Sequence, residues 1–254
     1  LAQAFGVQSI PTCVLLVGGK PVDGFMGAMS AGKVREFLNK NVPSEDEVAA
    51  AIDTEEAEAL IEQDNPAAAL EKLGEALAVN PANDDARFDY VRLLASQGQL
   101  EPAQAALAPT LTRIPVPLRF EALSQWINAL QFVANYDQST WAIDQFDSKI
   151  AENKRDFDTR FAKARVLMAR NEWTAALDEL LEIILRDKKW GDEAPRKTFI
   201  AILELLTPAR PKAGATVPGK TAGGIELMGK SAVQEDPQAA LVSTYRRRLS
   251  MMLN

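Results

Sequence analysis

A 34-residue interval between small residues recurs through the middle of the chain and constrains its fold more than any other feature. Ala69 and Ala103 are separated by this interval, and so are Ala142 and Ala176. The step from Ala103 to Ala142 is five residues longer and contains the segment 114–117, Ile-Pro-Val-Pro. A fixed period of this length indicates units that stack on their neighbours and bury one continuous core. The sequence therefore predicts four copies of one unit, with one slip in register.

The repeated units predict pairs of helices joined by a short turn, although the third unit lacks a clear first-helix pattern. Residues 64–81 resemble the second half of the tetratricopeptide consensus, with Ala69 at the small position where paired helices approach. Leu73 and Leu77 continue the apolar face at helical spacing, and Pro81 ends the helix because it lacks an amide hydrogen. The resemblance implies a mostly α-helical solenoid of about four tetratricopeptide repeats. The predicted turns fall on residue types that tolerate the left-handed conformation: Asp64, Gly98, Asp137 and Asn171.

The first 43 residues follow a different pattern, in which apolar runs of strand length are bounded by glycine and proline. This order of elements resembles the carboxyl-terminal half of the α/β thioredoxin fold. The elements are the end of a helix at residues 1–5, a β-hairpin of 10–17 and 22–26, and a helix at 33–41 with Ser30 as N-cap.

The thioredoxin resemblance is carried by two short segments. Residues 4–12, Ala-Phe-Gly-Val-Gln-Ser-Ile-Pro-Thr, resemble that family's segment around its cis-proline, and 24–28, Gly-Phe-Met-Gly-Ala, resemble the strand and glycine that follow. The resemblance implies a cis bond before Pro11 and a loop that offers backbone groups to a client peptide. The residues that it assigns to this loop are Ile10, Pro11, Thr12 and Gly27.

The redox part of a thioredoxin has no counterpart in this sequence. No Cys-x-x-Cys motif is present, and the chain begins at Leu1 without the strands and the active-site helix that would precede this half of the fold. We therefore expect the chain to be an amino-terminally shortened piece of a longer protein. Cys13 lies in an apolar run that predicts a strand buried on both faces, so core packing is the favoured interpretation. A reactive thiol is the alternative, and it requires exposure and nearby positive charge.

Composition excludes several classes of function. The chain has 28 Lys and Arg against 35 Asp and Glu, a formal charge of −7, which argues against nucleic acid as the main ligand. It has no histidine, the usual general base and the commonest metal ligand, so neither catalysis nor a metal or other cofactor is expected. No apolar run is long enough to span a membrane. With a single cysteine, the cytoplasm is the simplest compartment.

Four segments are predicted along the chain. They are the thioredoxin-like half at 1–43, the repeats with a capping helix at 44–206, a flexible insertion at 207–237 and a carboxyl-terminal helix at 238–254. The insertion is rich in glycine, alanine, proline and lysine. The last helix either caps the solenoid or docks on a partner, through Tyr245, Arg246, Arg247, Leu249, Met252 and Leu253.

Taken together, a thioredoxin-like half followed by tetratricopeptide repeats and a Tyr-Arg-Arg-x-Leu helix resembles the bacterial chaperedoxins of the YbbN type. The resemblance implies a holdase that binds unfolded proteins, protects them from aggregation and oxidation, and passes them to the chaperonin and Hsp70 systems. Binding rather than turnover is the implied activity. Aromatic residues on the repeat helices could contact clients, although packing in the core is the favoured interpretation for each: Phe88, Tyr90, Trp126, Phe132 and Trp141.

Two alternatives remain open. The chain could be a scaffold whose groove binds one defined peptide. An acidic peptide would require Lys, Arg and Asn on the first helices of consecutive repeats, but the first unit carries Glu55, Glu56, Glu58 and Glu62 there. The chain could also belong to a thiol-disulfide oxidoreductase whose catalytic half is missing. A Cys-x-x-Cys motif upstream of Leu1 would favour this second alternative, whereas a single cysteine or none would favour the holdase.

Overall fold

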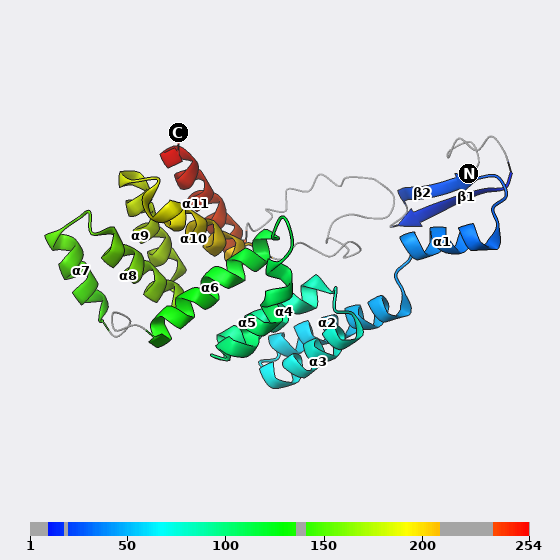
Figure 1. Cartoon of the computed structure of the whole chain (residues 1–254), viewed down its shortest axis with the longest axis horizontal. Coiled ribbons are helices and arrows are strands. Elements are labelled where there is room, and N and C mark those ends of the chain that lie inside the picture. Colours follow the sequence, from blue (N-terminus) through cyan, green and yellow to red (C-terminus); the bar gives the residue numbers. More distant parts are fainter. Residues whose placement is uncertain (1–9, 18–19, 136–140, 209–235, 254) are drawn as a thin grey trace, which may run out of the picture. The chain divides into compact units, whose positions relative to one another are not determined.

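A computed structural model describes residues 10–17, 20–135, 141–208 and 236–253 (Figure 1). The chain divides into two compact units, with the boundary after Ala49. This boundary lies inside helix α2 (Glu45–Glu62), slightly beyond the predicted end of the first segment at residue 43. The physical reason is that the buried side chains of α2 begin at Ala50, so its first turn contributes nothing to the core of the second unit.

The first unit contains a β-hairpin and one helix. Strands β1 (Thr12–Val17) and β2 (Lys20–Met26) pair antiparallel, and α1 (Ala31–Asn41) follows. The Ser30 side chain accepts a hydrogen bond from the backbone N–H of Lys33, so the predicted N-cap is confirmed. One aromatic pair, Phe25 and Phe37, joins the sheet to the helix at a centroid distance of 5.1 Å. The helix end predicted at residues 1–5 lies outside the described residues.

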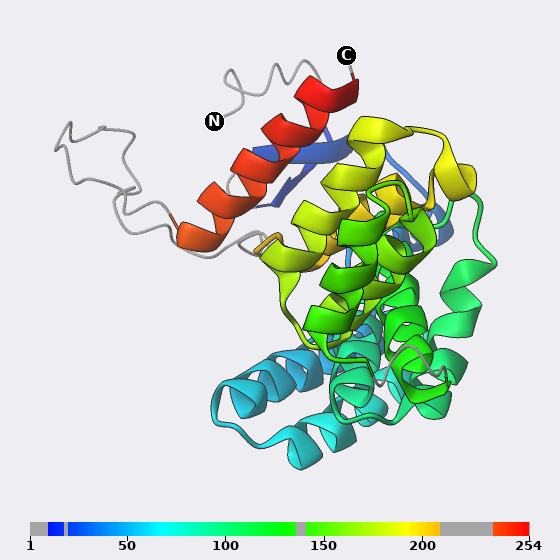
Figure 2. The same ribbon diagram turned by 90° about the vertical axis from the view of Figure 1, so that its left-hand side faces the viewer.

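The second unit is built from α-helices arranged in consecutive pairs (Figure 2). Its tight turns use left-handed residues at Asp64, Gly98 and Asn171, with φ of 56°, 74° and 60°, as predicted. The fourth predicted turn residue, Asp137, lies outside the described residues. The helices that follow α2 are α3 (Pro66–Val79), α4 (Asp84–Ser96), α5 (Leu100–Leu111), α6 (Leu118–Asn135), α7 (Ile143–Glu152), α8 (Phe157–Ala169), α9 (Trp173–Arg186), α10 (Trp190–Leu206) and α11 (Pro237–Leu253).

The recurring alanines occupy the helix contacts in three of the four units. Ala69, Ala103 and Ala176 are fully buried, which confirms the small position predicted from the 34-residue interval. The prediction is wrong for Ala142, which is exposed and is the N-cap of α7. Helix α7 begins only at Ile143, so Ala142 lies before its first turn. Ala176 lies inside the first turn of α9, which begins at Trp173. The buried contact of α7 is made instead by Phe146.

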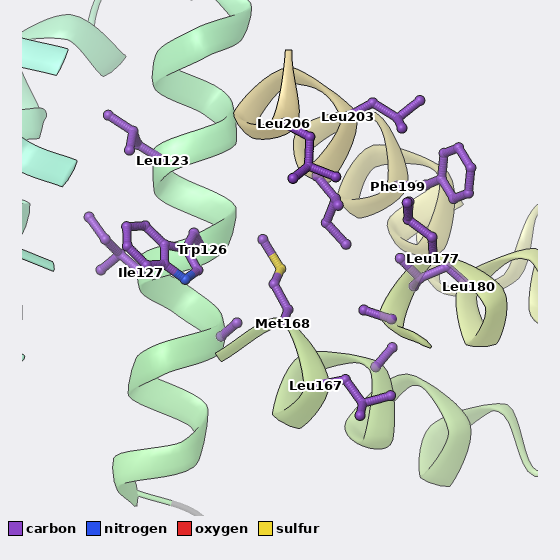
Figure 3. Packing of buried hydrophobic residues seen from close by; sticks show 14 of the residues in the cluster. Leu123, Trp126, Ile127, Leu167, Met168, Leu177, Leu180, Phe199, Leu203 and Leu206 are labelled. Atoms are coloured by element: carbon purple, nitrogen blue, oxygen red, sulfur yellow. The ribbon is translucent and has the colours of Figure 1, made fainter. Parts of the chain in front are cut away.

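The main core forms where α10 returns to pack along α6 (Figure 3). Trp126 and Ile127 of α6 share one hydrophobic cluster with Met168 of α8 and with Leu203 and Leu206 of α10. The predicted capping helix therefore covers the third unit as well as the fourth, since α10 also packs against α9. Within the described parts of the chain, no helix combines the length and the apolar character needed to cross a membrane.

Candidate functional site

A cleft of about 690 Å³ opens between α6, α8 and α10 in the second unit. These are the first helices of two consecutive pairs and the helix that follows them, and they meet because α10 packs along α6. The described residues that line the cleft are Gln125, Asn128, Gln131, Phe132 and Asn135 on α6, Phe161 and Arg165 on α8, and Ala194 and Thr198 on α10.

Amide side chains dominate the α6 wall of the cleft. Gln125, Asn128 and Asn135 recur at intervals of three and seven residues, which places them on one helical face, and Gln131 lies beside them. Each amide supplies both donors and an acceptor. The Thr198 hydroxyl donates a hydrogen bond of 3.2 Å to Oε1 of Gln125, which ties α10 to this wall. Asn128 and Asn135 are exposed and can form hydrogen bonds with a ligand.

Arg165 is the one charged residue among the described residues that line the cleft. Its guanidinium carbon lies 3.6 Å from the ring centroid of Phe132 and 5.3 Å from that of Phe161. Phe161 is packed in turn against Trp190, at a centroid distance of 5.5 Å. These cation–π contacts hold the guanidinium against aromatic surface, so its position in the cleft is restricted.

Helix α8 is held in place by a buried ion-pair cluster on its other face. Glu179 of α9 accepts hydrogen bonds from both Arg160 and Lys163, and Lys163 also donates to Asp147 of α7. Arg160 and Lys163 are each only 7% exposed. Because these cations are satisfied by carboxylates from two neighbouring helices, the cluster fixes α8, and with it Arg165, between α7 and α9.

Two buried groups, Lys163 and Tyr245, make the stability of this region depend on pH in the alkaline range. Burial alone would lower the pKa of Lys163, but hydrogen bonds to Asp147 and Glu179 outweigh it and raise that pKa. Burial and the carboxylate of Asp178 raise the pKa of Tyr245. Both groups thus hold their protons more tightly in the folded chain than in the unfolded one. The stability they contribute is fully present below about pH 10 and is lost as the pH rises through the raised pKa values.

We therefore expect the urea midpoint of the chain to fall as the pH is raised above about 10. The decline should be shallower in Tyr245→Phe, because this variant removes one of the two titrating groups. Urea unfolding, followed by circular dichroism at a series of alkaline pH values, measures the decline of the midpoint in the wild-type chain and in the variant. A midpoint that stays constant over this range, or an equally steep decline in Tyr245→Phe, contradicts the linkage.

The residues assigned by the thioredoxin resemblance come together at one edge of the first unit. The Ile10–Pro11 bond is cis, as predicted, and the backbone N–H of Gly27 donates a hydrogen bond of 2.7 Å to the carbonyl of Pro11. The Ile10 side chain is 92% exposed, and Thr12 is half-buried. The resemblance of residues 1–43 to thioredoxin, and the role of this loop in binding clients, remain predictions.

The prediction that Cys13 packs in a core is wrong. Its side chain is exposed, and among the described residues β1 pairs only with β2 instead of lying in the middle of a larger sheet. A redox role for Cys13 remains a prediction. The described residues contain no convergent group of three or more Cys, Asp or Glu side chains that could hold a metal ion.

The residues predicted to form a docking helix are divided between two faces of α11. Tyr245 and Leu249 are buried in the main core, where Tyr245 lies 6.2 Å from the ring of Phe199. Met252 and Leu253 are half-buried against the same cluster. Arg246 and Arg247 are exposed, and Arg246 donates a hydrogen bond to Thr207. These contacts are those of a cap, and docking on a partner remains a prediction.

The amide wall and Arg165 were not among the sequence-predicted site residues. Polar amides recur at helical spacing along residues 118–135, and this pattern could have indicated the wall. From sequence alone it is the pattern of an ordinary solvated helix face, and only the positions of α8 and α10 show that it borders a cleft. Of the five aromatic candidates for client contact, Trp126 and Phe132 are buried. The other three, Phe88, Tyr90 and Trp141, are half-buried.

Comparisons with known proteins agree with the helix pairs. Two tetratricopeptide-repeat families match the chain, one over residues 60–125 and the other over residues 136–216. Uncharacterized proteins of Mycobacterium tuberculosis and Mycobacterium bovis are each 25% identical over 212 residues. The match covers 84% of this chain but only 60% of the length of those relatives. Tetratricopeptide repeats indicate a scaffold for protein–protein interaction, and this chain is a protein that contains them.

Proposed function

We propose that the cleft between α6, α8 and α10 binds an extended segment of a partner polypeptide. The observation that carries this proposal is the row of amide side chains on α6. An extended segment presents backbone N–H and C=O groups that lack partners of their own, and Asn and Gln side chains can pair with either. From Gln125 to Asn135 the helix rises about 15 Å, which matches about four or five residues of extended chain.

Recognition through backbone groups tolerates many side chains, so the cleft should accept segments of different sequence. Arg165, held against Phe132 and Phe161, is part of the same lining. The acidic residues that argued against an acidic peptide, Glu55, Glu56, Glu58 and Glu62, lie on α2 and do not line this cleft. The role is one of binding without turnover.

Holding of unfolded proteins, as in the chaperedoxins, is the second candidate function. It is supported by apolar side chains that the hairpin leaves in solvent, including Ile10 at 92% and Met26 at 69% exposure. Exposed apolar surface of this kind favours contact with unfolded clients. Transfer of clients to the chaperonin and Hsp70 systems in the cytosol belongs to this second candidate.

The double variant Asn128→Ala, Asn135→Ala is expected to bind a polypeptide about 10-fold more weakly. Each lost hydrogen bond should contribute about 0.5–1.5 kcal/mol. Both side chains are exposed, so the fold should be unaffected. Fluorescence anisotropy with a labelled, reduced and alkylated polypeptide measures the affinity, and urea unfolding checks the fold.

Gln104→Ala is the matched control, because Gln104 is an exposed amide on α5 that does not line the cleft. It should leave the affinity unchanged. Equal affinities for the double variant and the control contradict peptide binding in the cleft. The same proteins should then be tested for suppression of client aggregation, since suppression that survives the double variant favours holding by the hairpin.

A further inference from the structure

Helix α10 begins with a left-handed turn of three consecutive residues, 191–193. Gly191, Asp192 and Glu193 have φ of 58°, 54° and 60°, with ψ of 36°, 46° and 21°. Residues other than glycine adopt this conformation mainly as single residues, because their Cβ atom comes too close to the following carbonyl oxygen. Strained backbone of this kind clusters at binding sites and switch regions, and it persists only where surrounding contacts hold it.

Aromatic contacts of Trp190, the residue before the left-handed turn, hold the turn in place. The Trp190 ring packs against Phe157 and Phe161 of α8, at centroid distances of 6.1 Å and 5.5 Å and interplanar angles of 72° and 64°. Aromatic pairs in this geometry are favourable beyond the area that they bury. Two ion pairs also span the turn, but they are exposed and contribute little stability. These pairs are Arg196–Glu193, at 2.9 Å, and Lys197–Asp192, at 2.8 Å.

The left-handed turn connects residues that belong to two walls of the peptide cleft. Phe161, which contacts Trp190, lines the cleft from α8, and Ala194 and Thr198 line it from α10. Neither Trp190 nor a residue of the turn is among the described residues of the lining. The turn therefore fixes the α10 wall relative to the α8 wall without touching a ligand itself.

Trp190 also affects the position of Arg165, through Phe161. The Arg165 guanidinium carbon lies 5.3 Å from the ring centroid of Phe161, and the same ring contacts Trp190. Without Trp190, the Phe161 ring would gain rotational freedom, and the guanidinium would lose part of the surface that holds it. A cleft with loosened walls loses more conformational entropy when a ligand binds, so its affinity is lower.

We propose that Trp190 and the left-handed turn position the aromatic wall of the peptide cleft, so that residues outside the cleft control its affinity. Trp190 is a positioning residue that fixes Phe161 and, through it, Arg165, while the turn directs Ala194 and Thr198 to the α10 wall. This inference rests on the proposed binding of a polypeptide in the cleft. Because coupling between two sites is reciprocal, a bound polypeptide stabilises the contact between Trp190 and Phe161.

Gly191→Ala tests the turn. The added Cβ meets the Cβ of Ala194 at an ordinary contact distance of 3.6 Å, so the substitution acts through backbone conformation. Gly98→Ala is the matched control, because Gly98 has φ of 74°, has no atom within 4 Å of an added Cβ and does not line the cleft. Both variants should lose stability in urea, but only Gly191→Ala should bind the labelled polypeptide more weakly, by about 3- to 10-fold. Equal affinities of the two variants would overturn the proposal.

Trp190→Leu tests the aromatic contact, and Trp173→Leu is its control, since Trp173 is half-buried in the same unit and does not line the cleft. Exchange of the Arg165 Nε–H with solvent, measured in ¹H–¹⁵N spectra without a ligand, separates positioning from a purely structural role. The Nε atom is buried, so exchange should be slow in the wild-type chain and in Trp173→Leu. It should be about 5-fold faster in Trp190→Leu and in Gly191→Ala. Unchanged exchange in these two variants would overturn the proposal, even if both bind the polypeptide more weakly.

Saturating polypeptide should restore the Trp190 contact in Gly191→Ala. The indole resonance of Trp190 should be displaced in this variant and should return toward its wild-type position, although Trp190 does not line the cleft. A resonance that does not respond to the polypeptide would overturn the coupling. A wild-type chain that binds no polypeptide, but whose Arg165 exchange depends on Trp190, would contradict the proposed function and support the positioning, so the two failures are distinguishable.

Discussion

Replacing Glu179 with glutamine is expected to lower the free energy of unfolding by about 3 kcal/mol or more, because breaking a buried ion pair leaves an uncompensated charge. The Glu179 carboxylate is the shared acceptor of Arg160 and Lys163. Its own side chain is 15% exposed, and the side chains of both cations are 9% exposed. After the substitution Lys163 keeps Asp147, but Arg160 has no other carboxylate partner among the recorded ion pairs of the described residues.

Glu182→Gln is the matched control on the same helix. Glu182 pairs with Arg186 one turn away, and its side chain is 43% exposed, so its loss should cost at most about 0.5 kcal/mol. Urea unfolding of both variants measures the difference. Similar midpoints for the two variants would show that the cluster around Glu179 is solvated in solution.

A third variant separates two contributions to the free energy of unfolding: the destabilisation caused by an unpaired buried charge and the net contribution of the whole ion-pair cluster. In Arg160→Met, Lys163→Met, Glu179→Leu, the cations and their shared carboxylate are removed together. Asp147 can remain, because its side chain is 53% exposed and water can solvate it. This variant should be close to the wild-type chain in stability, since apolar replacement of a buried ion-pair group is often neutral or stabilising. A loss as large as that of Glu179→Gln would assign the effect to packing instead of charge.

The repeat architecture could be predicted because its cause is local and periodic. Ala69, Ala103 and Ala176 recur at a fixed interval, since each must let two helices approach. Ala142 shares the interval but not the environment, because the start of α7 depends on the longer connection before it. Asn80 and Pro81 likewise mark the end of α3 by their own chemistry.

The candidate site was less predictable, because it depends on contacts distant in sequence. Asn128 and Asn135 have the pattern of a solvated helix face, and only the return of α10 to α6 makes this exposed face one wall of a cleft. Cys13 shows the opposite case, since an apolar run predicts a strand buried within a larger sheet, whereas among the described residues β1 pairs only with β2.

The contact between α10 and α11 yields the second large expected effect. Phe199 is fully buried on α10 and packs against Tyr245 of α11. Phe199→Ala should lower the free energy of unfolding by about 3–5 kcal/mol, because it removes buried apolar area and leaves a cavity. Leu185→Ala is the control, since Leu185 is 57% exposed on α9 and should change stability by at most about 0.5 kcal/mol.

Much of this loss should appear as weaker attachment of α11. Besides Phe199, the helix is held by Asp178, which accepts hydrogen bonds from the Tyr245 hydroxyl at 3.1 Å and from Arg248 at 2.7 Å. Arg248 and Asp178 are both partly exposed, so these hydrogen bonds contribute too little stability to compensate for the loss of the buried Phe199 ring. In native-state hydrogen exchange, the amides of α11 in Phe199→Ala should therefore lose protection before those of α8 and α9. Uniform loss across all three helices would contradict this, and would show that α11 unfolds only with the whole unit.

The same experiment decides how the predicted docking residues could act. Tyr245 and Leu249 are buried while α11 is attached, so a partner can use them only in the fraction of molecules that have released the helix. Any partner that binds this face should then bind Phe199→Ala more tightly than the wild-type chain, because the variant populates the released state. A partner that uses the exposed Arg246 and Arg247 should bind both proteins equally. Pull-down on purified chaperonin with the two proteins distinguishes these cases, and equal capture assigns docking to the exposed face of an attached cap.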